Sequence, residues 1–270
     1  MRQKYTEHQK KEVFKLWNTG NYLRSDLALK LDIPYSSIIR ILKQQGYIKP
    51  PRGESQRKYP VIHDFFEVIN TEEKAYFLGL LYADGFNDEK KGIIQINLQS
   101  KDEEILKKFS AYIQPTKQLY YTSDKELCKM IICSKKMSKD LTKWGCVYKK
   151  SLILEFPHFL PDDLMSHFIR GFFDGDGCVM ADMKKKVFHF KILSTKTVVE
   201  NIQKYLVANC NLNITKIIEE ITPSTGNIKY NVAYGGRRQL LRIRDYLYKD
   251  ATIFLQRKYN RFFSISLTKR

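Results

Sequence analysis

Two segments of this chain carry nearly the same apolar string, and each ends in an aspartate followed by glycine. The first, residues 77–85, reads Phe-Leu-Gly-Leu-Leu-Tyr-Ala-Asp-Gly, and the second, residues 169–177, reads Ile-Arg-Gly-Phe-Phe-Asp-Gly-Asp-Gly. The terminal aspartates, Asp84 and Asp176, are separated by roughly the length of one small domain. A repeated apolar helix that ends in a carboxylate predicts two half-sites that meet at a pseudo-two-fold axis.

Small residues within the two motifs indicate how the predicted helices meet. Gly79 and Ala83 are four residues apart, as are Gly171 and Gly175, so each pair lies on one face of its helix. Because glycine lacks a Cβ, helices that face each other through these residues can bring their backbones unusually close. We therefore expect the two terminal aspartates to emerge side by side.

Two adjacent carboxylates repel and raise each other's pKa unless a cation lies between them. Mg²⁺ prefers one or two carboxylates together with water and phosphate oxygens, and Mn²⁺ is its expected substitute. Such an ion at a scissile phosphate can activate water and stabilise the leaving oxygen. The alternative is two core helices with acidic ends, but two copies in matching domain contexts favour metal-assisted phosphodiester hydrolysis.

From about residue 61 the predicted elements occur twice in the same order. In the first half, Ser100-Lys101-Asp102-Glu103 is typical of a capping box and predicts a helix to about Ile113. Alternating apolar and polar residues predict strands over Ile93–Gln99, Lys117–Tyr121 and Leu127–Cys133, and a further helical stretch contains Leu141 and Trp144.

The second half repeats this pattern. It predicts strands over Val187–Leu193, Thr215–Ile221 and Ile228–Tyr234, and helices over Ser194–Cys210 and Arg237–Tyr248. An extra strand in each half could lie within 86–92 or 181–186. The expected fold is therefore α+β, with half-domains at 61–160 and 161–270.

Residues 1–46 predict a small all-α domain. Its three short helices span Glu7–Trp17, Leu23–Leu31 and Tyr35–Gln45, with stops at Gly20 and Gly46. This arrangement resembles a helix-turn-helix, whose recognition helix would present Tyr35, Ser36, Ser37, Arg40 and Lys43. The alternative is a bundle that only packs on the main domain. Residues 47–60, rich in proline and basic residues, predict a linker.

The charge of the chain favours a nucleic-acid partner. Its formal net charge is +18, and a surplus this large indicates a polyanion. No apolar run is long enough to span a bilayer, so a membrane partner is disfavoured. The five cysteines include no Cys-x-x-Cys pair, which predicts reduced thiols rather than a disulfide framework or a zinc site.

With these motifs the chain resembles a single-chain LAGLIDADG homing endonuclease over about residues 61–265. The resemblance implies metal ligation by Asp84 and Asp176, and by the backbone carbonyls of Ala83 and Gly175. The earlier acid position of each motif, Tyr82 and Asp174 here, is not expected to bind the catalytic metal. The resemblance also implies a basic residue near the metal from the C-terminal part of each half, which we assign to Lys150 and Lys258.

The resemblance further implies two saddle-shaped antiparallel sheets that lie along the DNA major groove. Amide and basic side chains can pair with base edges there. The candidates for DNA contact in the two halves are Gln95, Asn97, Gln99, His189, Lys191, Lys229, Asn231, Arg237 and Arg238.

The function expected from these features is site-specific, divalent-metal-dependent cleavage of both strands of DNA. The family suggests a monomeric enzyme of a mobile element, encoded in an intron or free-standing, in the cytoplasm of a bacterial or phage-infected cell. One alternative is a DNA-binding regulator that keeps the fold without cutting. Another is a maturase that binds intron RNA. Cleavage of duplex DNA distinguishes the endonuclease from the regulator and the maturase.

Overall fold

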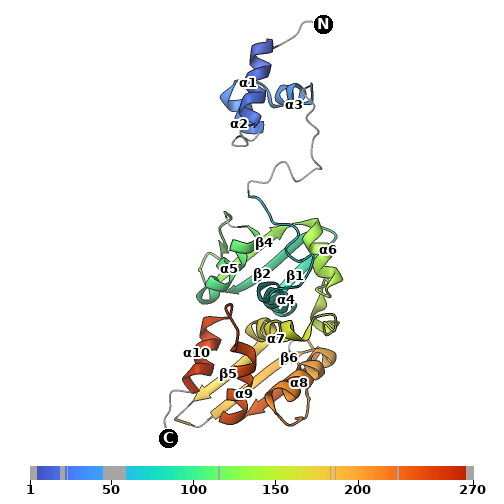
Figure 1. Ribbon diagram of the computed structural model, residues 1–270, viewed down its shortest axis with the longest axis vertical. Helices are drawn as coiled ribbons and strands as arrows, with labels where there is room; N and C mark the ends of the chain where they lie inside the picture. Colours follow the sequence, from blue (N-terminus) through green and yellow to red (C-terminus); the bar gives the residue numbers. More distant parts are fainter. Residues whose placement is uncertain are drawn as a thin grey trace. The chain divides into compact units, whose positions relative to one another are not determined.

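The computed structural model divides the chain into two compact units, Met1–Pro60 and Val61–Arg270 (Figure 1). It describes residues 5–18, 22, 24–44, 59–114, 116–182, 184–185, 187–223 and 225–265. The predicted linker at 47–60 lies outside the described residues except for its last two positions. Each unit is described by itself.

The N-terminal unit is a three-helix arrangement of α1 (Glu7–Asn18), α2 (Arg24–Lys30) and α3 (Tyr35–Gln44). It has a core of its own, formed by the buried apolar residues Val13, Leu27, Ile33, Ile38, Ile41 and Leu42. The three predicted helices are confirmed within the described residues, whereas Leu23, Gln45 and both predicted glycine stops lie outside them.

The second unit contains two α+β halves with the same element order, as predicted. The first half comprises α4 (Glu72–Asp84), β1 (Gly85–Asp88), β2 (Ile93–Gln99), α5 (Glu103–Ile113), β3 (Tyr120–Tyr121), β4 (Leu127–Cys133), α6 (Lys135–Lys143) and the 3₁₀ turn η2 (Lys150–Leu152). The second half comprises α7 (Asp162–Asp176), β5 (Gly177–Asp182), β6 (Val187–Ser194), α8 (Lys196–Cys210), β7 (Ile218–Ile221), β8 (Ile228–Gly235), α9 (Arg237–Tyr248) and α10 (Gln256–Ser264).

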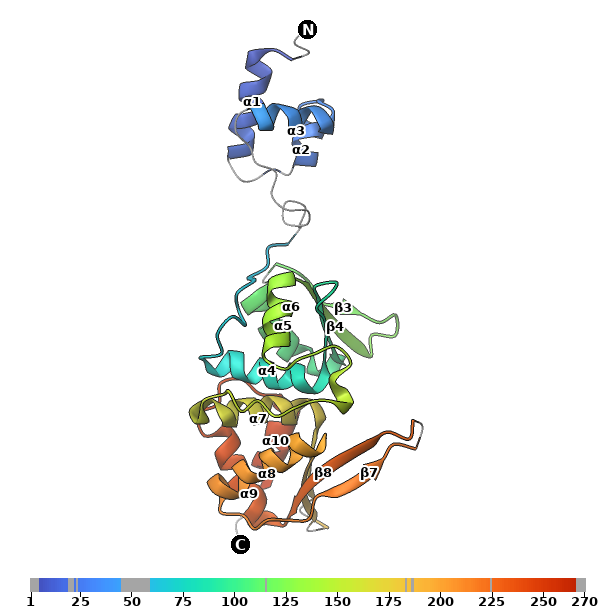
Figure 2. The ribbon, with the colours of Figure 1, turned by 90° about the vertical axis from the view of Figure 1, so that its right-hand side faces the viewer.

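Each half forms one four-stranded antiparallel sheet, in the orders β1-β2-β4-β3 and β5-β6-β8-β7. Side chains alternate across each sheet, so Ile94 and Ile96 of β2 are buried beneath helices while Asn97 and Gln99 are exposed. In Figure 2 the helices lie on one side of both sheets, and the β3–β4 and β7–β8 hairpins extend away from them in the same direction. Among the described helices, none has the length and apolar character needed to cross a bilayer.

The structure corrects several predicted element boundaries. β1 and β5 follow directly after the motif helices, so the extra strands overlap the two suggested regions but begin earlier. β3 and β7 are shorter than predicted, α8 begins two residues after Ser194, and α10 was not predicted.

The predicted capping box at Ser100–Glu103 is wrong. Residues Ser100–Asp102 form a 3₁₀ turn, η1, and the N-cap residue of α5, Asp102, makes no side-chain cap hydrogen bond. Its carboxylate instead accepts from Arg257 Nε, at 2.9 Å and 3.0 Å to its two oxygens. Glu103, the acid of the predicted box, accepts from Lys107 Nζ and from Tyr121 Oη of β3, each at 2.5 Å, and Ser100 N donates to Glu126 O.

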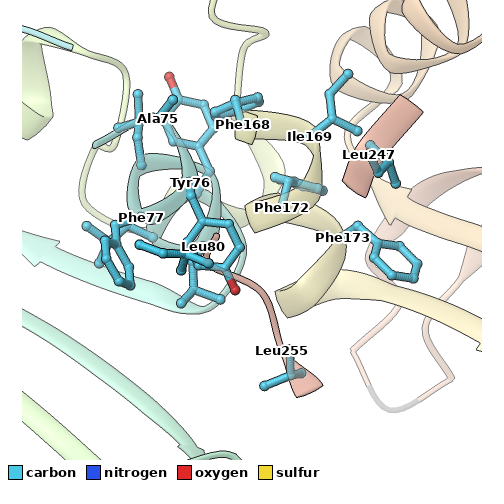
Figure 3. Close-up of a cluster of buried hydrophobic side chains, with 14 of the residues drawn as sticks. Ala75, Tyr76, Phe77, Leu80, Phe168, Ile169, Phe172, Phe173, Leu247 and Leu255 are labelled. Carbon is cyan, nitrogen blue, oxygen red and sulfur yellow. The ribbon is translucent and has the colours of Figure 1, made fainter. Parts of the chain in front are cut away.

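The two halves meet along α4 and α7, whose backbones touch through glycine. A Cβ added to Gly171 would lie 2.8 Å from the Tyr76 carbonyl carbon and 3.0 Å from Leu80 N, with the Tyr76 oxygen closer still. A Cβ on Gly79 would lie 2.8 Å from Phe172 N. Apolar side chains flank this contact on both helices, as Figure 3 shows.

We predict that Gly171→Ala strongly destabilises the second unit, because the new methyl group can only be accommodated by moving one helix backbone. Overpacking of this kind costs about 1–3 kcal/mol or more in the free energy of unfolding, which urea denaturation measures. The matched control is Gly235→Ala, since a Cβ there meets only Phe188 O, at 3.6 Å. Equal stability losses in both variants would contradict the close backbone contact.

Candidate functional site

The structure places two aspartates at equivalent positions, because Asp84 is the last residue of α4 and Asp176 the last residue of α7. Each helix is ended by the following glycine, whose N–H donates to Leu81 O after α4 and to Phe173 O after α7. A Cβ on Gly85 would lie 2.5 Å from Leu81 O, and a Cβ on Gly177 would lie 2.5 Å from Phe173 O. The repeated Asp-Gly pair thus ends each helix abruptly and leaves a carboxylate at its end.

The two helix ends are in contact. A Cβ on Gly175 would overlap the methyl group of Ala83 and would lie 3.1 Å from an Asp84 carboxylate oxygen. The small residues of both motifs therefore lie at the closest approach of the helices, and the Asp84 carboxylate lies against the α7 backbone. No such approach would be possible with a larger residue at position 175.

Both carboxylates keep solvent-exposed surface, yet the surrounding protein makes their ionisation unfavourable. Partial burial, followed by repulsion from Asp176, raises the pKa of Asp84 to about 6. Partial burial also raises the pKa of Asp176, against the opposing effects of Lys229, Lys150 and Lys258. The site therefore holds two crowded carboxylates whose negative charge is only partly balanced.

This donor set fits a hard divalent cation. Within the described part of the chain, no cluster of three or more His, Cys, Asp or Glu side chains could hold a metal ion. A cation at Asp84 and Asp176 would therefore have to complete its shell with water, backbone carbonyls or a ligand, which is the habit of Mg²⁺. The carbonyls of Ala83 and Gly175 directly precede the two carboxylates.

A buried lysine lies beside each helix end. Lys150, in η2, donates from Nζ to Gly85 O, and its relative exposure is 5%. Lys258, in the first turn of α10, is 3% exposed and donates to Phe173 O at 2.6 Å, Asp174 O at 2.9 Å and Gly177 O at 2.6 Å. These carbonyls belong to helix C-terminal ends, where a cation is favourable.

The environment of Lys258 also changes its proton affinity. Burial lowers the pKa of Lys258 to about 8, and Asp174 and Asp84 only partly oppose that shift. Lys258 and Lys150 also appear among the charges that lower the pKa of both Asp84 and Asp176. The four predicted catalytic side chains therefore interact electrostatically as one group.

The earlier acid positions of the motifs have different surroundings. Asp174 is buried and accepts from Tyr76 Oη of α4 at 2.7 Å and from Leu255 N at 2.8 Å. Tyr82, its counterpart, donates from Oη to Trp144 O within its own half. Neither side chain joins the Asp84–Asp176 pair through a hydrogen bond that the structure shows. This network was missed at the sequence level because its partners are far apart in the chain.

The strand candidates for DNA contact share the sheet face opposite the helices. Gln95, Asn97 and Gln99 lie along β2, and Asn97 pairs across the sheet with Lys129. His189 and Lys191 are half-buried on β6, and Lys229 is half-buried on β8. Lys191 also forms an ion pair with Glu220 of β7.

Asn231 lies on the same sheet face as Lys229 but is only 2% exposed. Its amide donates to Glu220 Oε1 at 2.8 Å and to Ile218 O at 3.3 Å, so its donors are already used within the sheet. Donation from the Asn231 amide to a base would require the bonds to Glu220 and Ile218 to break.

Arg237 and Arg238 begin α9 and therefore lie beyond the end of β8 rather than on the sheet.

The candidates in the N-terminal unit occupy α3. Tyr35, Ser36, Arg40 and Lys43 are exposed there. Ser37 is half-buried and accepts from Tyr5 Oη at 3.2 Å, so it is partly engaged in holding the unit together.

Comparison with known proteins gives one family match, to a LAGLIDADG-like domain over residues 163–248. This match begins in α7, includes the second Asp-Gly pair and ends with α9. No curated protein sequence matches the chain. The matched residues form most of the second half and are similar to a LAGLIDADG-like domain.

Solved structures with similar backbones have low sequence identity to this chain. The I-LtrWI LAGLIDADG homing endonuclease bound to target DNA is 13% identical, with a TM-score of 0.49 over 73% of this chain and 89% of its own. Full-length DUF199/WhiA from Thermatoga maritima is 16% identical, with a TM-score of 0.45 over 77% and 66% of the two chains. The meganuclease I-CpaMI bound to uncleaved DNA is 13% identical, with a TM-score of 0.47 over 73% and 90%.

We predict that Asp84→Asn raises the melting temperature at pH 8. Because the folded-state pKa of Asp84 lies above the ordinary value of 3.8, the ionised carboxylate disfavours folding, and that penalty grows as the pH rises from about 4 to above 6. The gain in melting temperature should therefore fade toward pH 4. Differential scanning calorimetry at several pH values measures it in metal-free buffer.

The control is Glu89→Gln, which removes the same charge from an exposed position in the turn after β1. It separates the local effect at the paired carboxylates from a general change in net charge. A loss of stability in Asp84→Asn that is equal at pH 4 and pH 8 would contradict the crowded, ionised pair.

Proposed function

We propose that this protein is a site-specific endonuclease that depends on a divalent metal and cuts both strands of DNA. The observation that carries the proposal is the pairing of Asp84 and Asp176 at the touching ends of α4 and α7. The match of residues 163–248 to a LAGLIDADG-like domain supports it, as does the net charge of +18.

In this proposal Asp84 and Asp176 hold Mg²⁺, with the carbonyls of Ala83 and Gly175 as further donors. When bound, the ion would polarise the scissile phosphate and lower the pKa of water. Lys150 and Lys258 place positive charge beside the carboxylates, where negative charge develops on the phosphate. With a pKa of about 8, Lys258 Nζ can also release and take up a proton near neutral pH.

The exposed sheet faces are the proposed DNA-binding surface. Asn97 and Gln99 are exposed on the first sheet, and Lys229 on the second is close enough to lower the pKa of Asp176. Amide and ammonium groups of this kind can bond base edges in the major groove. Two sheets with the same strand order would each serve one half of a target site, and the carboxylate pair at the helix ends would serve both strands.

Two alternatives keep the DNA-binding or basic surface without cutting. A regulator would use the three-helix N-terminal unit, whose exposed Arg40 and Lys43 favour contact with nucleic acid. A maturase would instead bind structured RNA from an intron. Both alternatives predict that Asp84 and Asp176 can be neutralised without loss of nucleic-acid binding or of the biological activity.

We expect the unmodified protein, with Mg²⁺, to cut a randomised duplex-DNA library at one recoverable sequence, and Mn²⁺ to replace Mg²⁺. Asp84→Asn and Asp176→Asn should each lower the cleavage rate by at least about 100-fold, because a metal ligand is lost. Sequencing of the cut ends identifies the site, and gel assays with each strand labelled measure the rates.

The matched control is Asp163→Asn, in the first turn of α7, which removes an aspartate from the opposite end of the same helix. Its cleavage rate should stay within about threefold of the unmodified protein, as for a surface substitution. Sequence-specific retention of DNA without cutting by any divalent ion would support the regulator, whereas selective binding of intron RNA would support the maturase.

We also expect the double substitution Arg40→Ala and Lys43→Ala to weaken binding of the recovered DNA site by about tenfold, because two positive charges leave the proposed recognition helix. The cleavage rate of fully bound DNA should not change. Fluorescence anisotropy at fixed salt measures the affinity. The control removes Lys11 and Lys15, two exposed residues of α1, and an equal effect of both pairs would argue against a specific role for α3.

A further inference from the structure

We infer that Lys258, the basic residue of the second half, is positioned by contacts with the first half, whereas Lys150 is positioned within its own half. The link is the segment 249–255, which joins α9 to α10 and which we name the strap. For its effect on strand cleavage the inference rests on the proposed function, but the placement of the two lysines can be tested without it.

Glu72, at the start of α4 in the first half, holds the middle of the strap. Its carboxylate accepts from Thr252 N at 2.7 Å, from Thr252 Oγ1 at 2.9 Å and from Ile253 N at 3.1 Å. The same carboxylate accepts from Arg170 of α7 at 2.6 Å, and Arg170 Nε donates to Ile253 O at 2.9 Å. One residue of the first half therefore bonds two consecutive strap residues and the arginine beneath them.

Tyr76, one helical turn further along α4, acts on the end of the strap through Asp174. Tyr76 Oη and Leu255 N both donate to the same Asp174 oxygen. Leu255 is the N-cap residue of α10, and its carbonyl accepts from Lys258 N at 3.0 Å. Lys258 Nζ in turn bonds the backbone carbonyl of Asp174. The hydrogen bonds thus form a closed loop from Asp174 to Leu255 to Lys258, and the first half contributes its tyrosine to that loop.

The first turn of α10 is attached to the first half directly as well. Arg257, next to Lys258, forms an ion pair with Asp102 at the start of α5, and Asp102 is only 5% exposed. Lys108 of α5 lies over the ring of Phe254 in the strap, at 6.0 Å from its centre. Two residues that closely precede Lys258 in the sequence, Phe254 and Arg257, are therefore in contact with α5 or its N-cap residue.

Among the hydrogen bonds and ion pairs of the described residues, neither Lys150 nor the segment 144–149 before it bonds the second half. The segment before it is held by the first half itself, since Trp144 O accepts from Tyr82 Oη and Trp144 Nε1 donates to Phe66 O at 2.6 Å. Cys146 Sγ contacts Leu81 O at 3.6 Å, and Lys150 Nζ bonds Gly85 O. All of these partners precede residue 151, within the first half. Hydrogen bonds to the second half lie four residues after Lys150, where Leu154 O accepts from Thr195 Oγ1 at 2.6 Å and from Thr197 Oγ1 at 3.4 Å.

The two lysines should therefore respond differently when cross-half contacts are removed. Tyr76→Phe deletes one hydroxyl group at the interface, and Asp102→Ala deletes the ion pair with Arg257. Both changes should loosen Lys258 without reaching Lys150. Tyr82→Phe is the matched control, because it deletes a tyrosine hydroxyl of the same helix that bonds only within the first half.

The first readout is the rate at which an amine-acetylating reagent modifies each lysine, followed by mass spectrometry of the full-length protein. We expect the ratio of Lys258 to Lys150 modification to rise between about two- and tenfold in Tyr76→Phe and in Asp102→Ala, the range set by the loss of one hydrogen bond or ion pair. The ratio should fall in Tyr82→Phe. An unchanged ratio, or an equal rise at both lysines as in general destabilisation, would overturn the inference.

The second readout is the rate of cutting of each strand of the recovered DNA site, with the two strands labelled differently. Lys258→Met and Lys150→Met identify which strand depends more on each lysine. Tyr76→Phe and Asp102→Ala should shift the ratio of strand rates in the same direction as Lys258→Met. If the unmodified protein does not cut, the proposed function fails and the acetylation ratio alone decides the placement of Lys258; if it cuts and neither ratio moves, the inference fails.

Discussion

The contact between the α4 and α7 backbones is the constraint on which the rest of the second unit depends. Gly79 and Gly171 allow each helix to touch the main chain of the other, and no side chain could be inserted at either contact. Because both helices end in an aspartate at matching positions, this single contact also fixes the separation of the two carboxylates. The sheets follow directly, since β1 and β5 begin at the residues after Asp84 and Asp176.

The carboxylate pair is kept at some cost to stability. Partial burial raises the pKa of both aspartates, so their ionised forms disfavour folding near neutral pH. Lys150 and Lys258 offset part of that charge while their Nζ atoms satisfy carbonyls at the helix ends. The same two lysines therefore bond main-chain carbonyls at the helix ends and balance negative charge at the carboxylate pair. These two roles explain why they are buried in a chain with abundant surface lysine.

The sequence was sufficient to predict the elements that come from a repeated motif or from an alternation of apolar and polar residues. The paired motifs indicated the helices, their small-residue contact and the two carboxylates, and the alternation along β2, β4 and β8 predicted those strands closely. It was insufficient where a distant partner decides the outcome. Glu103 reads locally as the acid of a capping box but accepts from Tyr121 instead, and Asn231 reads as an exposed amide but bonds Glu220. Neither partner is visible from local spacing.

The strap makes the two halves non-interchangeable. The motif register places Phe168 where the first half has Tyr76, and Leu164 where it has Glu72. A homodimer of second halves would therefore present apolar side chains to Asp174 and to the main-chain N–H groups of residues 252 and 253. The residues at these two positions therefore tie the present second half to the first half as its partner.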